Sequence, residues 1–234
     1  MRINKYLSYM GICSKKQADN LIKDGCVFVK GQPAVLGMQV EQGDEVMVND
    51  QLVTEVPEAV FLLYHKPVGV VCTHDVRVAN NIENAIQYPC RVFAVGRLDK
   101  ASEGLMLLTN RGEVVNRLMR SENKHEKVYR VWVDKAITTS FVERMRQGVA
   151  ILDTTTLPCK VEQVDEKLFE ITLVQGLNRQ IRRMCQVLGY RVERLQRIKI
   201  LEFELDGIES NQIYKLTCEQ QKMLLERIGL NLES

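Results

Sequence analysis

The stretch AVGRLDKASEGLMLLTN, residues 94–110, holds a compact group of charges between two apolar runs. The charged residues are Arg97, Asp99, Lys100 and Glu103. Both flanking segments, RVFAVG and GLMLLTN, consist mainly of aliphatic residues that are typical of buried strands. An aspartate between two cations, on a loop that two buried strands hold in place, is a candidate for chemistry.

Length and composition describe a globular protein of one or two domains. The chain has 234 residues, of which 45% are hydrophobic and 26% charged, enough to bury a core. No apolar run approaches the ~20 residues of a membrane span, and the N-terminal MRINKYLSYMG lacks an apolar signal core. We therefore expect a cytoplasmic protein without a membrane anchor.

Cysteine and histidine show no pattern that predicts a metal site. The seven cysteines are scattered, odd in number and without a C-x-x-C pair, and the three histidines lack ligand spacing. We expect free thiols in a reducing compartment and no metal. Nothing in the sequence suggests more than a monomer.

The net charge of +2 conceals a segregated distribution. Residues 1–34 hold six Lys/Arg against two acids, and residues 179–199 hold seven against one. Residues 200–234 reverse the balance, with seven acids against three bases. Such segregation favours basic surfaces that face a polyanion, foremost a nucleic acid, although solvated helix faces are the alternative.

Local patterns predict an α+β protein with a small N-terminal domain. Residues 2–24 read as two short helices, the second capped by Ser14, and a strand follows in CVFVKG. We expect this domain over 1–53, an acidic linker over 54–60 and a strand-rich domain over 61–234.

In the larger domain, HKPVGVVCT predicts a strand, a break at Lys66-Pro67 and a second strand after Gly69. KVYRVWVDK alternates like a strand, TTSFVERMRQG reads as a helix with a threonine cap, and NRQIRRMCQVLG reads as a second helix. TCEQQKMLLERIG begins with a capping box of Thr217 and Gln220.

Four motifs together resemble known families. NKYLSYMGICSKKQADNLIKDGCVFVKG resembles the alpha-L RNA-binding domain. HKPVGVV, GRLDKASEGLMLLTN and GLNRQIRRM resemble, in the family's order, the motifs of RsuA-like pseudouridine synthases. The resemblance spans nearly the whole chain, and HEKVYRV and VQGLNRQIRRMC are most similar to the branch called ribosomal large subunit pseudouridine synthase F.

The resemblance implies a pseudouridine synthase fold, with a mixed, mainly antiparallel sheet flanked by helices. It also implies an isomerase that detaches uracil from C1′ of ribose, rotates it and rejoins it through C5, without a cofactor. The substrate would be 23S ribosomal RNA. The alternative is a transfer RNA, as the sole substrate or as a second one. A non-catalytic ribosome-assembly factor and a nucleoside or glycoside hydrolase are the competing interpretations.

By the same resemblance, the catalytic residues are Asp99, Tyr129 and Arg182. Asp99 would attack C1′ or uracil C6, or remove the C2′ proton, and the sequence leaves these routes open. The Arg182 guanidinium would pair with this carboxylate through two parallel hydrogen bonds and keep it ionised. The Tyr129 ring would stack on the extracted uracil, where the alternative is an ordinary core tyrosine.

Further residues are predicted to bind RNA. Arg97 would occupy the space that a flipped base leaves, and Glu103 would pair locally with Lys100 or Arg97. Arg179 and Arg183 are expected to point away from Asp99, toward phosphates. The full RNA-binding set is Arg97, Lys100, Lys5, Ser14, Lys15, Lys16, Lys23, Lys30, Lys66, Asn178, Arg179 and Arg183.

Overall fold

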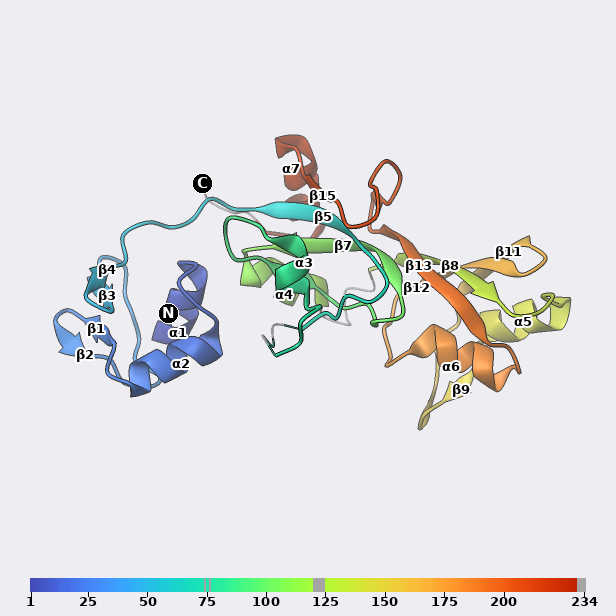
Figure 1. The fold of residues 1–234 in the computed structure, drawn as a ribbon, viewed down its shortest axis with the longest axis horizontal. Helices are drawn as coiled ribbons and strands as arrows, with labels where there is room; N and C mark the ends of the chain where they lie inside the picture. The colour runs from blue at the N-terminus through green and yellow to red at the C-terminus, as the bar shows by residue number, and fades with distance from the viewer. Residues whose placement is uncertain (74, 76, 120–124, 231–234) are drawn as a thin grey trace. The chain divides into compact units, whose positions relative to one another are not determined.

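The computed structural model describes residues 1–73, 75, 77–119 and 125–230. The chain divides into two compact units, drawn in Figure 1. The N-terminal unit comprises Met1–Val60, Pro89–Val92 and Asn110–Gly112. The C-terminal unit comprises Phe61–Tyr88, Phe93–Thr109 and Glu113–Ser234. The sequence did not indicate that two short later segments group with the first unit.

In the N-terminal unit, two helices pack on a small sheet. Its elements are α1 (Ile3–Tyr9), α2 (Lys15–Lys23), β1 (Val27–Val29), β2 (Gln32–Pro33), β3 (Val46–Val48) and β4 (Gln51–Leu52), with strand order β2-β1-β3-β4. Ile3 and Leu7 of α1 and Ala18 of α2 are fully buried against the sheet. Ser14 caps α2 as expected, and its capping box is completed by Gln17.

The C-terminal unit is built on one large sheet. Within the described residues its strands follow the order β11-β12-β8-β13-β7-β5-β15, with β14 paired to β13 and β6 to β7. Among these described strands the pairs are antiparallel except for β13 with β7. The prediction of a mixed, mainly antiparallel sheet flanked by helices is therefore confirmed.

The bounds of this unit's elements are as follows. The strands of the large sheet are β5 (Phe61–Lys66), β6 (Phe93–Val95), β7 (Glu103–Thr109), β8 (Lys127–Val133), β11 (Lys160–Asp165), β12 (Leu168–Leu173), β13 (Val192–Ile200), β14 (Phe203–Glu204) and β15 (Ile213–Lys215). A small ribbon is formed by β9 (Ala150–Ile151) and β10 (Thr154–Thr155). The helices are α3 (Ile82–Ile86), α4 (Gly112–Met119), α5 (Thr139–Gln147), α6 (Gln180–Val187) and α7 (Cys218–Arg227).

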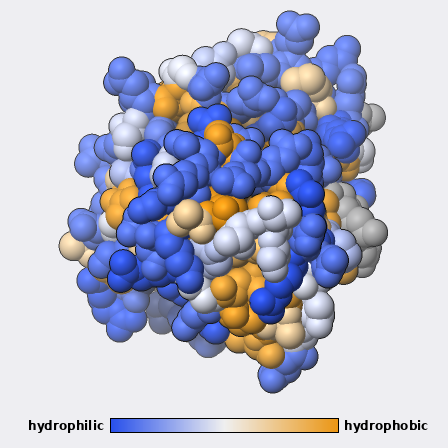
Figure 2. All heavy atoms as spheres, turned by 90° about the vertical axis from the view of Figure 1, so that its right-hand side faces the viewer, coloured by the Kyte–Doolittle hydropathy of each residue, from blue (hydrophilic) through white to orange (hydrophobic). Residues whose placement is uncertain are grey.

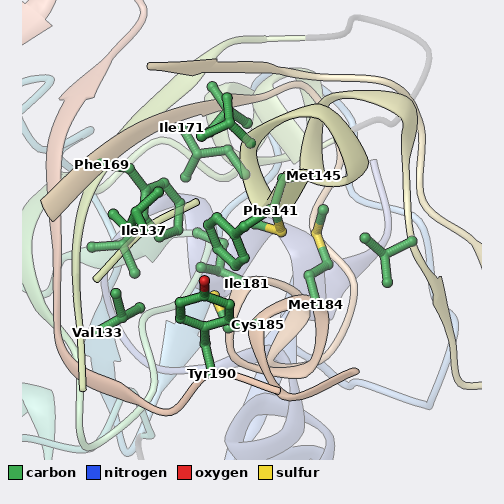
Figure 3. Packing of buried hydrophobic residues seen from close by; sticks show 14 of the residues in the cluster. Val133, Ile137, Phe141, Met145, Phe169, Ile171, Ile181, Met184, Cys185 and Tyr190 are labelled. Carbon is green, nitrogen blue, oxygen red and sulfur yellow. The ribbon is translucent and has the colours of Figure 1, made fainter. Parts of the chain in front are cut away.

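One face of this sheet is covered by α5 and α6, whose apolar residues form the core shown in Figure 3. The Phe141 ring lies 5.3 Å from the Phe169 ring and 4.2 Å from the Tyr190 ring, between centroids. Val131 and Val133 of β8 belong to this core. They lie on the same face of the sheet because alternate residues of a strand share a face. Tyr129 packs against the same cluster and therefore lies on the α6 face.

The opposite face of the sheet carries a pocket. Its lining includes His65 of β5, Val128 of β8 and Gln196 of β13. These residues alternate in sequence with Lys66, Tyr129 and Arg197, which assigns the latter three to the α6 face. Figure 2 shows the side of α5 and β11, where hydrophilic residues prevail and hydrophobic residues form small patches.

Local signals predicted most of these elements, with one error. Thr138 caps α5, and the capping box of Thr217 and Gln220 begins α7, as expected. The second strand predicted after Gly69 is wrong, since Val71 forms only an isolated bridge with Asn81. No described helix is long and apolar enough to cross a membrane.

Candidate active site

Asp99 lies in the loop 96–102 that joins the paired strands β6 and β7. Leu98 is buried, while Arg97 on one side is exposed and Asp99 on the other is about one-third exposed, at 34% of its side chain. Leu98 is thus anchored in the interior, while the charged residues on either side of it are accessible. The Asp99 carbonyl accepts a hydrogen bond from Ser102 N at 3.0 Å, which closes a tight turn.

Lys66, the last residue of β5, is completely buried. Its Nζ donates to the carbonyls of Pro67 and Val70, each at 2.8 Å, and Gly69 N donates to the Lys100 carbonyl at 2.8 Å. Because Lys66 holds the Val70 carbonyl in a turn, the chain does not continue as a strand. A fully buried ammonium cannot reach a phosphate, so the predicted RNA-binding role of Lys66 is wrong.

Among the described residues, the cation that pairs with the Asp99 carboxylate is Arg179, not Arg182. Arg179 Nη1 lies 3.9 Å from Asp99 Oδ2, an ion pair too long for a hydrogen bond. Arg179 precedes α6 in a left-handed conformation, with φ of 51°, which a non-glycine residue rarely adopts. The expectation that Arg179 points away from Asp99 is therefore wrong. Such strain is found most often at functional sites.

Arg182 instead holds the backbone of the same loop. Its Nη2 donates to the Ala101 carbonyl at 2.8 Å and approaches Ser102 Oγ at 3.4 Å, and its Nη1 donates to the Val192 carbonyl at 3.1 Å. The expected pair of two parallel hydrogen bonds with Asp99 is thus wrong. Burial lowers the pKa of Arg182, and Arg179 adds to this effect while Asp99 opposes it.

Arg183 and Asn178 form a local contact at the start of the helix. Arg183 Nε donates to the Asn178 carbonyl at 3.0 Å, and Nη2 donates to Asn178 Oδ1 at 3.2 Å. Asn178 is exposed, so the N-terminal end of α6 is accessible to solvent. Both residues stay predicted RNA contacts.

Glu103 makes a different ion pair from the one expected. Its Oε1 accepts a short hydrogen bond from Arg194 Nε, and the Arg194 guanidinium lies 4.6 Å from the centre of the Trp132 ring. The predicted local pair with Lys100 or Arg97 is wrong, because Gln196 of β13 lies directly opposite Glu103 and brings Arg194 close. Glu103 is therefore paired with β13 rather than with a cation of its own loop.

Four residues form one continuous row across the sheet, which we call the site floor. Tyr129 of β8 is opposite Arg197 of β13, Arg197 is opposite Gly104 of β7, and Gly104 is opposite Lys66 of β5. Residues directly opposite one another project from the same face. The site floor thus places the predicted catalytic Tyr129 on the α6 face with two buried cations.

Sequence reasoning missed Arg197. The signal was present in VERLQRIKI, because Arg197 follows the buried Leu195 at strand spacing and thus occupies a core-facing position. A charge at such a position is rarely found without a partner or a function.

The predicted basic residues of the N-terminal unit lie on its surface. Lys5, Lys15, Lys16, Lys23 and Lys30 are all exposed. Lys30 pairs with Asp44 at 2.8 Å, and the Ser14 hydroxyl is engaged in its capping box. Among the described residues, no group of three or more His, Cys, Asp or Glu is placed to hold a metal.

Comparison with known proteins assigns the family. Residues 60–187 match the family model described as RNA pseudouridylate synthase, and residues 1–46 match the S4 domain. The chain belongs to the RsuA-like pseudouridine synthases. As a pseudouridine synthase it is an isomerase, and the resemblance inferred from its motifs is confirmed.

Relatives of this pseudouridine synthase span nearly its whole length. It is 47% identical over 222 residues to the dual-specificity RNA pseudouridine synthase RluF of Escherichia coli K12, covering 94% of this chain and 77% of that protein. It is 31% identical over 232 residues to ribosomal large subunit pseudouridine synthase B of Bacillus subtilis, covering 95% of each. A crystal structure of a pseudouridylate synthase, 27% identical, covers 97% of this chain and 99% of its own with a TM-score of 0.69.

Proposed function

We propose that this pseudouridine synthase isomerises a specific uridine of 23S ribosomal RNA and that Asp99 is its attacking group. The observation that carries the proposal is the bracing of the Asp99 loop. Gly69 N, Arg182 and the Ser102 turn all hold its backbone, while the carboxylate stays accessible. A fixed, solvent-reachable carboxylate is what attack at a sugar–base junction requires.

The roles of the neighbouring residues follow from their contacts. Arg179 supplies the direct positive charge beside Asp99, and Arg182 is a positioning residue that fixes the loop. Tyr129 stands on the α6 face of the sheet, where its ring can stack on the detached uracil. Rotation of the base and closure through C5 then replace the C–N bond by a C–C bond and release the C5 proton.

Access to a uridine in folded RNA requires base flipping, which costs a few kcal/mol of stacking and pairing. Arg97 is exposed two residues before Asp99 and is our candidate for the group that occupies the opened stack. The exposed lysines of the N-terminal unit supply phosphate contacts, which position RNA without reading its sequence.

Ribosomal RNA is favoured because the Bacillus subtilis relative is named for the large ribosomal subunit. A transfer RNA is retained as a second substrate because the Escherichia coli relative is described as dual-specific. We further propose a cytoplasmic monomer with an RNA-binding domain over 1–53, a linker over 54–60 and a catalytic domain over 61–234.

The test is Asp99→Asn with RNA that carries tritium at uridine C5, since each isomerisation releases one labelled proton. We expect complete loss of tritium release and unchanged RNA affinity, because the substitution keeps the side chain's size. Tritium release at the parent rate would overturn the assignment of Asp99. Pseudouridine mapping in RNA from cells lacking this gene then identifies the uridine, and the loss of a site in 23S RNA is the expected result.

A further inference from the structure

Lys127 is the first residue of β8, the strand that carries Tyr129 of the site floor. It precedes Tyr129 by two residues, and alternate residues of a strand project from the same face about 7 Å apart. Leu173 lies directly opposite Lys127 on β12 and belongs to the core under α5 and α6. Because opposite residues share a face, Lys127 stands on the α6 face next to Tyr129.

The ammonium group of Lys127 has few partners within the protein. The residue is partly buried, and its Nζ donates one hydrogen bond, to the His125 carbonyl at 3.0 Å. An ammonium has three N–H donors, and among the described residues no carboxylate forms an ion pair with this one. Burial lowers the pKa of Lys127, and the positive charge of Arg197 adds to this effect. The described part of the protein therefore leaves this cation without a compensating anion.

The two cations of the site floor differ from Lys127 because they are enclosed. Lys66 is fully buried and donates to two carbonyls, and Arg197 is 2% exposed and donates from Nε to the Leu105 carbonyl at 2.7 Å. Arg197 Nη2 is buried as well and has no hydrogen-bond partner within the described ranges. Of these three cations on the α6 face, Lys127 is the one that a ligand can reach.

The carboxylates of the neighbouring loop and strand are already engaged. Asp99 pairs with Arg179, and Glu103 pairs with Arg194. Withdrawing part of an ammonium from water without a charged partner is unfavourable. The anion that would compensate Lys127 must therefore come from a ligand.

We propose that Lys127 binds a backbone phosphate of the RNA at the target uridine, while the Tyr129 ring stacks on the detached base. Phosphate oxygens accept charge-assisted hydrogen bonds from the N–H groups that the His125 carbonyl leaves free. Lys127 and Tyr129 stand side by side on one face, and a nucleotide offers a phosphate and a base as adjacent groups. Lys127 is thus a substrate-positioning residue that takes no part in bond making. The inference rests on the proposed function for the place of the base at Tyr129.

The experiment measures single-turnover tritium release by the full-length protein over a range of enzyme and salt concentrations. The probes are the ribosomal and transfer RNA fractions of cells that lack this gene, grown with uridine tritiated at C5, and the fraction that the parent enzyme modifies is used. In Lys127→Met we expect the half-saturating enzyme concentration to rise about tenfold, because one charge-assisted contact is lost. The log–log salt slope should become shallower by about 0.7, while the saturated rate constant stays near the parent value.

Two variants serve as comparisons. Lys127→Arg keeps the positive charge and should keep the parent's salt slope. Arg130→Met is the matched control, because it removes a cation one residue after Tyr129 on the opposite face of the same strand, one that pairs with Glu170 at 2.9 Å. Its half-saturating concentration and salt slope should equal those of the parent.

An unchanged half-saturating concentration in folded Lys127→Met overturns the proposal, and so does a raised one with the parent's salt slope. A lower saturated rate constant alone also overturns it, since that result would assign Lys127 to the support of β8. Should Lys127→Met not fold, Lys127→Gln decides by the same criteria. Tritium release by Asp99→Asn would refute the proposed function without altering the salt slope of Lys127→Met, so the two failures are distinct.

Discussion

The two units of the molecule use positive charge in opposite ways. In the N-terminal unit the lysines of α1, α2 and the following strand are exposed. In the C-terminal unit Lys66 and Arg197 are buried. Arg182 is partly buried, and its guanidinium contacts two backbone carbonyls and one hydroxyl. Cations of the first kind face solvent, although Lys30 also pairs with Asp44, whereas those of the second kind bond to the protein.

The difference shows how affinity and chemistry are separated along the chain. Exposed cations act in water, where salt screens them, and they gain energy chiefly by displacing counterions from phosphates. Buried cations act in a low-dielectric interior, where they fix the backbone through hydrogen bonds to carbonyls. Substitutions in the two units should therefore change different measured quantities.

The largest effect on stability is expected at Gly104, because its backbone lies directly against the backbone of the buried Arg197. In Gly104→Ala a Cβ would lie 2.2 Å from the carbonyl oxygen and 2.5 Å from the nitrogen of Arg197, at a φ of +117°. Neither strand can yield without loss of pairing, so we expect the C-terminal unit to lose about 3 kcal/mol or more in free energy of unfolding, measured with urea.

Gly112→Ala is the control for this substitution. Gly112 lies at the start of α4, and a Cβ there would meet no atom within 4 Å. Its free energy of unfolding should stay near the parent value or rise slightly. Equal effects of the two substitutions would show that the contact between β7 and β13 does not require glycine.

An intermediate effect is expected at Arg182, which fixes the loop without touching the Asp99 carboxylate. Arg182→Met removes the bonds to the Ala101 carbonyl and Ser102 Oγ, and a displaced loop should lower kcat about 100-fold with little change in KM. Arg183→Met, which removes the contacts to Asn178 and a predicted RNA contact but none to the loop 96–102, is the comparison in steady-state assays. A rise in KM with unchanged kcat would place Arg182 in RNA binding instead.

The smallest effect on the chemical step is expected from the exposed lysines of the N-terminal unit. Glutamine at Lys5, Lys15, Lys16, Lys23 and Lys30 should weaken RNA binding and make the log–log salt slope shallower by about 0.7–0.9 for each lost phosphate contact. The control replaces Lys160 and Lys222, which are 69% and 79% exposed in the C-terminal unit. An unchanged slope in the first variant would exclude that surface from phosphate contact.

Much of the fold was predictable because its signals are local. Capping residues fixed the start of the helices at Ser14, Thr138 and Thr217, and alternation identified β8. The strand expected after Gly69 failed because this turn is held by Lys66 Nζ at the Val70 carbonyl and by a tertiary contact, the hydrogen bond from Gly69 N to the Lys100 carbonyl. No local pattern reports such a bond.

The candidate site was predicted in its elements and not in its pairings. The motifs placed the loop of Asp99 and the start of α6 correctly beside one another, as the Arg179 ion pair shows. Which arginine faces the carboxylate depends on the left-handed turn at Arg179 and on how the buried stripe of α6 orients the helix. The neighbours of Arg197 could not be predicted without the strand order, since they lie on β7 and β8.

The separation of affinity from chemistry is tested most directly by single-turnover tritium release at saturating enzyme. Two variants are compared with the parent: Asp99→Asn, and the variant with glutamine at the five exposed N-terminal lysines. We predict that the lysine variant reaches the parent rate constant once saturated, and that Asp99→Asn releases no tritium although it binds RNA. A slower saturated rate in the lysine variant, or release by Asp99→Asn, would contradict this account.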